Sequence, residues 1–515
     1  MQQETEKFGN NKLSRVCTTL FNYIRSNISL ILFFVFLFIY ISVGMCFSYY
    51  SFDFLNTHFN TIFGADTPRV IGDFTQIGAN HYRTAVHPLQ LILIQPFISF
   101  VNGFFHDMPM AIIIAQSLAG ASVVALLNST LYNFTLKKDL SLIFSSIYGV
   151  SFSAILFTAI PETYVFSALF NILLWYYISL FLKNNVNKLS WANVLVLSLI
   201  TIASFGIIMA NAIITSISVL FLLASVYKSN LKNVLKDFGK ICLISISLTL
   251  GLVVLQKVAW HAPLFFENLL LAVTKPNDFE EYKYMDFSIS IAKTYQIYLQ
   301  NFIAPITAIP FTKLSGLTIE TNSFRFNNCI NLIYILPVTL LYLVGLFGCF
   351  IKKSIDPFVT LGAIIILEIL FSYFYGWNSE LEAIESFIYS QNYLLYLFLF
   401  IGLAFNFVWN NITKAFLGCL FLYQLIVNFY FLSKIFVFLQ ENATKNFNGF
   451  VMFIYGLLIT AIIAIFIFFV KKVLADKILT SLVEQRFFYG SLVYLFYIVF
   501  YAIIVSINYW RVYYC

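Results

Sequence analysis

Charge is scarce in this chain. Lys, Arg, Asp and Glu make up only 10% of its 515 residues, whereas soluble domains carry about 25%. Hydrophobic residues reach 60%, more than a soluble interior can bury, and intrinsic disorder needs the opposite composition. A membrane β-barrel is also disfavoured, because its strands alternate apolar and polar residues. The composition therefore predicts an all-α polytopic membrane protein.

Paired cysteines, metal-binding patterns and internal repeats are also lacking. The seven cysteines form no C-x-x-C pair, and the five histidines have no i, i+4 spacing. We therefore expect no cofactor and no tightly held metal, while carboxylates leave room for a weakly bound divalent cation. The absence of repeats disfavours an inverted-repeat transporter. The net charge of +7 suits membrane topology, and nucleic acid is not an expected partner.

Apolar runs of about 20 residues, each enough to cross a bilayer as a helix, occur along the whole chain. We predict about 13 transmembrane helices, at residues 28–47, 110–128, 140–160, 164–182, 191–209, 212–227, 241–256, 330–351, 357–375, 387–407, 413–438, 449–470 and 490–509. A shorter run, 89–105, contains Gln90, Gln95 and Pro96. We expect this run to be a re-entrant or interfacial helix.

The distribution of basic residues orients these helices. With residues 1–27 in the cytoplasm, 19 of the 30 Lys and Arg residues fall in short cytoplasmic linkers, as the positive-inside rule requires. A full crossing by 89–105 would move Lys137 and Lys138 to the outside. We therefore predict a single transmembrane domain over residues 28–515. Its outer segments are 48–109, which bears juxtamembrane helices, 257–329 and 376–388.

The first outer segment holds the densest group of reactive side chains, namely Asp66, Arg69, Asp73, His81, Tyr82, Arg83 and His87. A carboxylate beside arginines stays ionised and can act as a general base. Arginine forks fit phosphate oxygens. This combination predicts transfer of a group from a phosphate-linked donor. The alternative is a solvated loop whose charges pair with one another. His87, just before Pro88, either contacts phosphate or caps the following helix.

Further candidates lie in other outer positions. Glu162, in an outward turn, is either a functional ionisable group at the membrane boundary or a helix cap. Polar and aromatic residues near the tenth predicted span suit sugar hydroxyls and ring faces, or else form an interfacial aromatic belt. These residues are Trp377, Glu380, Tyr389 and Gln391. Arg325, before the eighth span, is a candidate for contact with a lipid phosphate.

The chain resembles the glycosyltransferase C (GT-C) superfamily, which includes protein O-mannosyltransferases and the aminoarabinose transferase of lipid A. The resemblance lies in the architecture and in the strings 65–70, 81–83, 87–89, 161–164 and 389–392. It implies an integral membrane glycosyltransferase that uses a polyprenyl-phosphate-linked sugar donor. The acceptor would be a cell-surface glycan such as lipopolysaccharide, a lipid or a protein. The implied location is a bacterial inner membrane with the active face in the periplasm.

The resemblance also implies roles for residues. An Asp acts as general base, with inversion at the anomeric carbon, and Asp66 is the first choice. Because this chain lacks the adjacent acidic pair of many members, Asp73 and Asp53 stay open as alternatives. Arg69, Arg83, His87 and Arg325 would hold the donor phosphate. The sugar or acceptor cavity would include His81, Tyr82, Glu162, Trp377, Glu380, Tyr389 and Gln391.

Two other functions compete with this one. A lipid-linked oligosaccharide flippase would place ionisable groups inside spans, where Glu368 is nearly alone. An O-antigen polymerase or ligase also handles lipid-linked glycans outside the membrane. We would expect its arginine-rich loop in the second half of the chain, whereas the richest loop here comes first.

Overall fold

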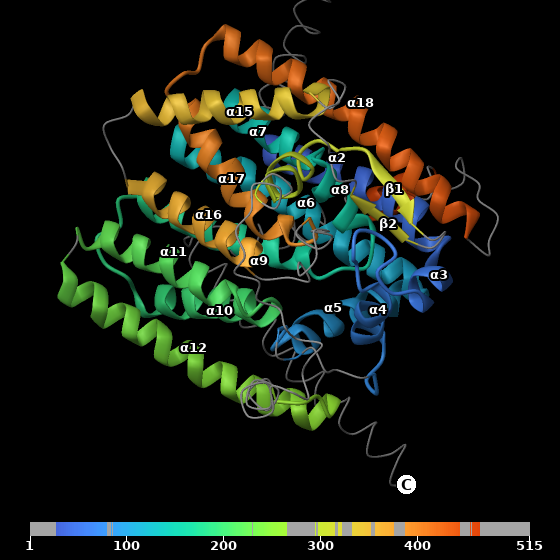
Figure 1. Ribbon diagram of the computed structural model, residues 1–515. Helices are drawn as coiled ribbons and strands as arrows, with labels where there is room; N and C mark the ends of the chain where they lie inside the picture. Colours follow the sequence, from blue (N-terminus) through green and yellow to red (C-terminus); the bar gives the residue numbers. More distant parts are fainter. Residues whose placement is uncertain are drawn as a thin grey trace, which may run out of the picture.

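The structure is a computed structural model that describes most of the chain between residues 27 and 463 (Figure 1). The described residues are 27–79, 84, 86–228, 230–264, 294, 297–314, 318–321, 332–351, 356–374, 387–442, 454 and 456–463. Residues 1–26, the predicted span at 490–509 and most of outer segments 257–329 and 376–388 lie outside them. The regular secondary structure of the described residues is helical, apart from one short β-hairpin and one isolated bridge.

The first half of the chain carries the helices that frame the first outer segment. These are α2 (Ile28–Gly44), the π-helix η1 (Met45–Tyr49), α3 (Phe52–Thr57), α4 (Thr67–Thr75), α5 (Gln90–Phe105), α6 (Met108–Thr135), α7 (Lys138–Gly149), α8 (Phe152–Ala159), α9 (Tyr164–Lys183), α10 (Trp191–Ile207) and α11 (Asn211–Val226). The short helix expected at 89–105 is present as α5, and the first outer segment also contains the short helices α3 and α4.

The second half adds longer helices and the hairpin. These are α12 (Leu231–Trp260), the π-helix η4 (Leu299–Ile303), β1 (Phe311–Leu314), β2 (Thr318–Thr321), α15 (Leu332–Ile351), α16 (Asp356–Phe374), α17 (Ser390–Phe405) and α18 (Asn411–Glu441). The two strands are antiparallel, with Phe311 opposite Thr321 and Leu314 opposite Thr318.

The fold is that of a helical membrane protein, as the composition predicted. Among the described residues, six helices are long and apolar enough to cross a bilayer, or seven if α7 and α8 form one bent span. They are α6, α9, α12, α15, α18 and the continuous α2–η1 unit. Shorter apolar helices, including α5, α10, α11 and α17, pack among them. The total of about 13 spans stays a prediction.

One predicted span, 140–160, is broken rather than continuous. Helices α7 and α8 meet at an angle of 54°. Tyr40 Oη donates to the carbonyl of Gly149 at 2.9 Å, and Asn428 Nδ2 donates to that of Val150 at 2.8 Å. Beyond the break, the Ser153 N–H donates to the carbonyl of Pro305 at 3.0 Å. The backbone groups freed by the break thus find partners inside the protein, as a membrane interior requires.

Helix α5 begins and ends on the same side of the bundle. At its start, the Leu89 N–H donates to the carbonyl of Gly206 at 2.8 Å, near the end of α10. A Cβ on Gly206 would lie 2.7 Å from Leu89, so only glycine permits this approach. Past its end, Asp107 accepts a hydrogen bond from Tyr49 Oη at 3.0 Å. Because Tyr49 and Gly206 both end outward-running predicted spans, this geometry agrees with a helix that does not cross.

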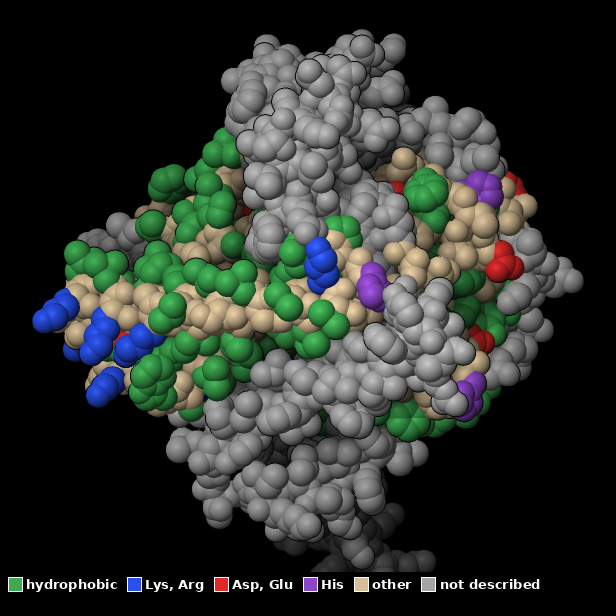
Figure 2. Space-filling model, turned by 90° about the horizontal axis from the view of Figure 1, so that it is seen from below, with side chains coloured by type: hydrophobic (Ala, Val, Ile, Leu, Met, Phe, Trp, Pro, Cys, Tyr) green, Lys and Arg blue, Asp and Glu red, His purple; other side chains and the backbone are tan. Residues whose placement is uncertain are grey.

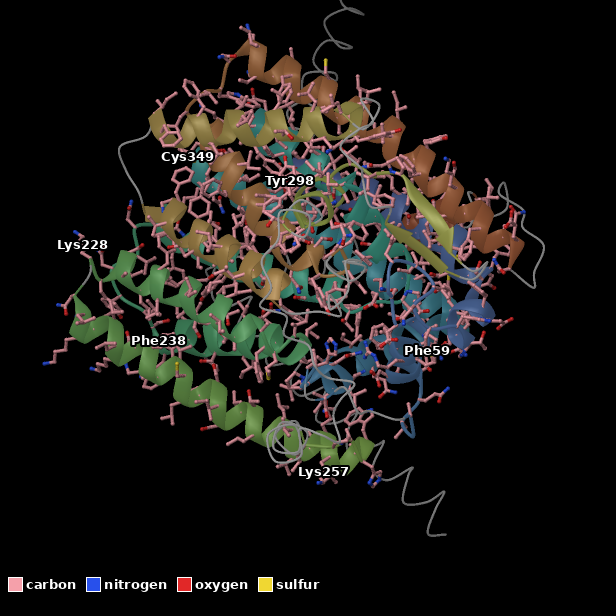
Figure 3. The ribbon with its side chains drawn as sticks, viewed as in Figure 1. Phe59, Lys228, Phe238, Lys257, Tyr298 and Cys349 are labelled. Carbon is pink, nitrogen blue, oxygen red and sulfur yellow. The ribbon has the colours of Figure 1, made fainter. Side chains whose placement is uncertain are left out.

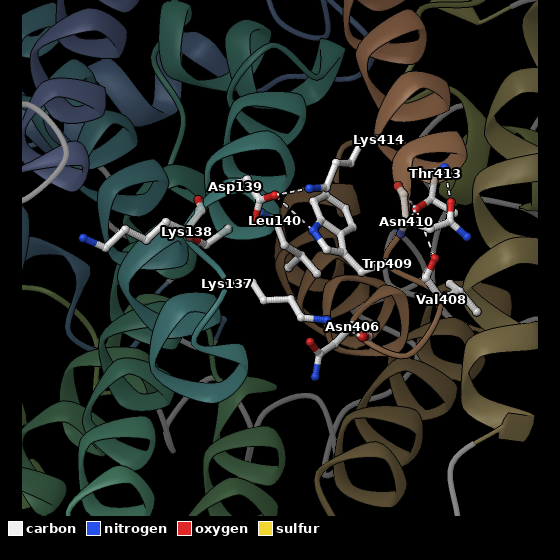
Figure 4. A network of polar contacts seen from close by, with 11 residues as sticks. Lys137, Lys138, Asp139, Leu140, Asn406, Val408, Trp409, Asn410, Thr413 and Lys414 are labelled. Carbon is white, nitrogen blue, oxygen red and sulfur yellow. Dashed lines mark hydrogen bonds and ion pairs between the residues drawn. The ribbon is translucent and has the colours of Figure 1, made fainter. Parts of the chain in front are cut away.

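The opposite end of the bundle joins linkers that the sequence places in the cytoplasm. Lys137 Nζ donates to the carbonyl of Asn406 at 2.8 Å. Asp139 pairs with Lys414 at 2.6 Å and accepts from Trp409 Nε1 at 3.1 Å (Figure 4). In the view of Figure 2, most Lys and Arg side chains gather at one end of the molecule, while the His and most acidic side chains lie toward the other. The charge distribution therefore follows the predicted sidedness.

Candidate functional site

Helix α4 presents Asp66, Arg69 and Asp73 as one ion-paired group. Their i, i+3 and i, i+4 spacing places them on one helix face. Arg69 Nε lies 3.2 Å from Asp66 Oδ2, and Arg69 Nη1 lies 3.2 Å from Asp73 Oδ2. The side chains of Arg69 and Asp73 are each 7% exposed, whereas that of Asp66 is 19% exposed. Asp66 is therefore the carboxylate of this group that an incoming molecule reaches most easily.

Glu162 joins this group from the turn between α8 and α9. Its Oε1 accepts a hydrogen bond from the Asp66 N–H at 3.3 Å, and its Oε2 accepts one from the Thr163 N–H at 3.0 Å. Gln116 Nε2, on α6, donates to the carbonyls of Ile160 at 2.7 Å and Glu162 at 3.0 Å. The Glu162 side chain is buried. The Gln116 amide holds the backbone of the turn between α8 and α9, and this turn thereby positions the Glu162 carboxyl.

The electrostatics of Glu162 differ from those of a surface glutamate. Burial raises the pKa of Glu162 to about 7, the Arg69 guanidinium and the Thr163 N–H oppose the rise, and the Asp66 carboxylate adds to it. A carboxyl with a pKa near neutrality can both hold and release a proton at the working pH. Glu162, with its pKa of about 7, thus lies in a cluster of three carboxyl groups and one guanidinium.

Aromatic packing holds the loop that leads into Asp66. Phe63 contacts Phe387 and Phe152, with ring centroids 5.1 and 6.0 Å apart. Its φ of 51° and the φ of 80° at Gly64 turn the chain sharply before α4. A positive φ is costly for a bulky residue, so the buried ring contacts of Phe63 must maintain it. On α4 itself, Phe74 packs edge-on against Phe166 of α9, at 6.1 Å.

The second outer segment reaches the same loop. The Phe63 N–H donates to the carbonyl of Ile319 at 2.8 Å, and the Ile319 N–H donates to that of Thr61 at 2.9 Å. These bonds form a parallel bridge between Ile62 and Ile319, so β2 pairs with the loop before Asp66. The two outer segments that the sequence places on one face of the membrane are therefore in direct contact there (Figure 1).

His87 lies at a different contact. Its Nδ1 is 2.7 Å from the carbonyl oxygen of Ile207 at the end of α10. Because a carbonyl only accepts, the Nδ1 carries the proton and donates. The ring is buried and ties the chain before α5 to α10. The sequence offered phosphate contact or capping of the following helix, and this bond is neither, because its partner is a carbonyl at the end of α10. Nε2 is the atom that a phosphate contact would require.

Two further predicted residues occupy the start of α17. The ring of Tyr389 packs edge-on against that of Tyr164, with ring centroids 6.0 Å apart. Tyr164 follows Glu162 by two residues, so Tyr389 lies near the site. Gln391 is buried, and its Nε2 donates to the carbonyl of Ser153 at 2.6 Å, which joins α17 to α8. The other candidates lie outside the described residues: His81, Tyr82, Arg83, Arg325, Trp377 and Glu380.

Sequence reasoning missed a buried network of uncharged polar side chains beneath the site. Asn211 Nδ2 donates to Ser167 Oγ at 2.8 Å, and Ser167 Oγ donates to Asn392 Oδ1 at 3.0 Å. The network joins the outer ends of α9, α11 and α17. The sequence signal for this network was the presence of amide side chains inside or beside otherwise apolar runs. A buried amide is costly there unless it is hydrogen-bonded, so each one predicts a polar partner.

Within the part of the chain that the structure describes, no group of three or more His, Cys, Asp or Glu side chains is arranged to hold a metal ion. Arg69 directs two guanidinium nitrogens to Asp66 and Asp73, and these contacts orient both carboxylates. The arrangement therefore suits proton transfer at a half-buried carboxylate on the outer end of the bundle. No protein-family model, curated protein or solved structure matches the chain.

Proposed function

We propose that this protein is an integral membrane glycosyltransferase of the GT-C type. It moves a sugar from a polyprenyl-phosphate-linked donor to a cell-surface glycan, lipid or protein. The observation that carries the proposal is the cluster on α4, in which Asp66 is held by Arg69 and bonded through its backbone to Glu162. The proposed location is a bacterial inner membrane, with this cluster facing the periplasm.

Asp66 is the proposed general base. It takes the proton from an acceptor hydroxyl, whose oxygen attacks the anomeric carbon of the donor sugar. The bond between that carbon and the phosphate oxygen breaks, and the polyprenyl phosphate leaves with the bonding electrons. A single displacement inverts the anomeric configuration. Asp66 is more exposed than Asp73, which supports it over this second candidate. Asp53, the third candidate, lies on a different helix, α3, and its side chain is exposed.

The proposed roles of the other residues follow from what they contact. Arg69 directs Nε and Nη1 to carboxylates, so its main role is to orient Asp66. Its Nη2 is the atom left for the donor phosphate, which Arg83, Arg325 and His87 would also contact. Glu162 would accept the proton from Asp66 after each transfer, because its pKa of about 7 lies near the working pH.

Transfer is tested with purified protein in liposomes that contain polyprenyl-phosphate sugars and a candidate surface-glycan acceptor. We expect Asp66→Asn to reduce the transfer rate by roughly 100-fold or more, the range for loss of a general base. Asp53→Asn is the matched control in the same outer segment and should transfer normally. Undiminished transfer by Asp66→Asn would remove Asp66 from the mechanism, and equal loss in Asp53→Asn would point to Asp53.

A flippase of lipid-linked oligosaccharides is the second candidate, and one observation favours it. Glu368 of α16 is buried within an apolar helix, where ionisable groups are costly and usually functional. If Glu368 serves transport, Glu368→Gln should abolish translocation of a fluorescent lipid-linked glycan across the liposome. If the protein is a transferase, the same variant should retain transfer. Translocation without any transfer would favour the flippase.

A further inference from the structure

An apolar groove lies between α10, α11 and α12, away from the Asp66 cluster. Its volume is about 300 Å³. Its walls are Ile202, Phe205, Val219, Phe238, Ile241 and Leu250, with hydroxyl groups of Thr201, Ser216, Ser245 and Thr249 between them. On α12 the lining residues run from Phe238 to Leu250, which at 1.5 Å per residue is about 18 Å. That length is close to half the ~30 Å hydrocarbon thickness of a bilayer, the depth of one leaflet.

The groove opens toward the surroundings of the bundle rather than into its core. Helix α12 stands at the edge of the molecule, and only 17% of its apolar window is buried (Figures 1 and 3). Ile246 and Leu250 line the groove and are 60% and 49% exposed. In a membrane, exposed apolar residues on such a helix face lipid chains. The natural occupant of this groove is therefore a hydrocarbon chain that enters from the side.

A group of lysines marks one end of the groove. Lys232, Lys236 and Lys240 recur every fourth residue in the first turns of α12, and Lys228 precedes them. Asp237 is the only acidic residue between positions 228 and 240, and it pairs with Lys240 at 2.6 Å. Lys232 and Lys236 are exposed, with the exposed Leu231 and Leu235 beside them. This end therefore offers positive charge at the level where lipid headgroups meet water.

We propose that α10, α11 and α12 form a binding site for an anionic phospholipid of the bilayer, with its headgroup on Lys232 and Lys236 and one acyl chain in the groove. Two independent features support this occupant. The groove has about the length of one leaflet, and Lys232 and Lys236 precede Phe238, its first lining residue on α12, with one acid between positions 228 and 240. Basic pockets between helices are known to select anionic headgroups.

Two alternatives define the test. If the lysines only orient the helices, anionic and zwitterionic lipids should bind equally. If the groove holds the isoprenoid tail of a glycosyl donor, a polyprenyl phosphate should displace the phospholipid. We expect neither result. The lysines lie at the end of α12 opposite Trp260, and Trp260 lies at the end near the outer segment where a glycosyl donor would bind. The proposed lipid site does not depend on the proposed transferase activity.

The experiment is native mass spectrometry of the purified protein with dioleoyl phosphatidylglycerol or dioleoyl phosphatidylcholine, which share the same chains. We expect phosphatidylglycerol to bind more tightly and polyprenyl phosphate not to displace it. The double variant Lys232→Gln/Lys236→Gln should weaken phosphatidylglycerol binding roughly tenfold or more, since each lysine adds attraction to an anionic headgroup. Lys257→Gln, at the other end of α12, is the control and should bind normally. Equal binding of the two lipids, or displacement by polyprenyl phosphate, would overturn the proposal.

A second variant tests the groove itself. Ser245→Phe fills the lining of α12 and should reduce binding of phosphatidylglycerol, because the ring occupies the space of the acyl chain. Leu243→Phe adds a similar ring on the same helix at a position that is 67% exposed and outside the groove, and should bind normally. Thermal unfolding of both variants shows whether they are folded. Normal binding by a folded Ser245→Phe would place the lipid elsewhere.

Discussion

The backbone N–H of Asp66 donates to the side chain of Glu162 at 3.3 Å, which makes two residues 96 positions apart one structural unit. The bond fixes the start of α4 against the turn between α8 and α9. It also brings a third carboxyl to the cluster around Arg69. The position of the proposed base therefore depends on a buried group that titrates near neutral pH.

The first prediction concerns the pH dependence of stability. Burial raises the pKa of Glu162 from 4.5 to about 7, so the folded protein keeps this proton to a higher pH than the unfolded chain. The free energy of unfolding should therefore fall as pH rises from about 4.5 to 7, and this contribution should level off above pH 7. The total is roughly 3 kcal/mol for this group.

Thermal unfolding in detergent between pH 5 and 8 measures this effect. Glu162→Gln has no ionisable group at this position, so its unfolding temperature should change less over that range. Asp53→Asn, on an exposed carboxylate, should follow the wild type. Identical pH profiles for Glu162→Gln and the wild type would show that Glu162 titrates normally.

The second prediction concerns Arg69. Replacing Arg69 by Gln removes the guanidinium that pairs with Asp66 and Asp73, and breaking a buried ion pair costs roughly 3–5 kcal/mol. The double variant Arg69→Gln/Asp73→Asn should regain part of that loss, because one buried charge is removed. Lys228→Gln, on an exposed lysine, should change stability by less than about 0.5 kcal/mol. Chemical unfolding in detergent gives the comparison, and a stable Arg69→Gln would mean that the carboxylates are solvated.

The sequence predicted the class of fold and placed Asp66, Arg69 and Asp73 together in one outer segment, but it did not predict the helix α4 that aligns them. Apolar runs must cross a bilayer as helices, so most element positions follow from hydropathy. Asp66, Arg69 and Asp73 have helical spacing, so their contact is local. Glu162 was predicted only as a separate candidate. Its place beside Asp66 depends on how α9 packs on α4, which no local pattern encodes.

The break in the span 140–160 was not predicted for a related reason. Its residues are as apolar as those of a continuous helix, and neither Gly149 nor Ser151 forces an interruption. The partners that make it tolerable, Asn428 and the 305–306 backbone, come from distant parts of the chain. Only the amide of Asn428 inside an apolar run gave a signal, because a buried amide requires a partner.

The third prediction concerns the pairing of the two outer segments. Ile319→Pro removes the N–H that bonds the carbonyl of Thr61, so the loop before Asp66 loses one of its two backbone bonds to β2. We expect a lower unfolding temperature and slower transfer even where the protein stays folded. Ile319→Val keeps the N–H and should cost only about 0.5–1.5 kcal/mol. Full activity of folded Ile319→Pro would show that β2 does not position Asp66.

The last prediction concerns topology. In a cysteine-free background, single cysteines at Lys138, Lys228 and Phe59 are treated with a membrane-impermeant maleimide on intact cells. Phe59 is 57% exposed between α3 and α4, on the predicted outer side, and should label readily. Lys138 and Lys228 should label only after the membrane is permeabilised. Because α5 begins and ends against outward-running predicted spans, we expect it not to move Lys138 across the bilayer. If the cysteine at position 138 is labelled in intact cells and the cysteine at position 59 is not, the orientation of the protein is the opposite of the predicted one. Labelling of both would mean that α5 crosses the membrane.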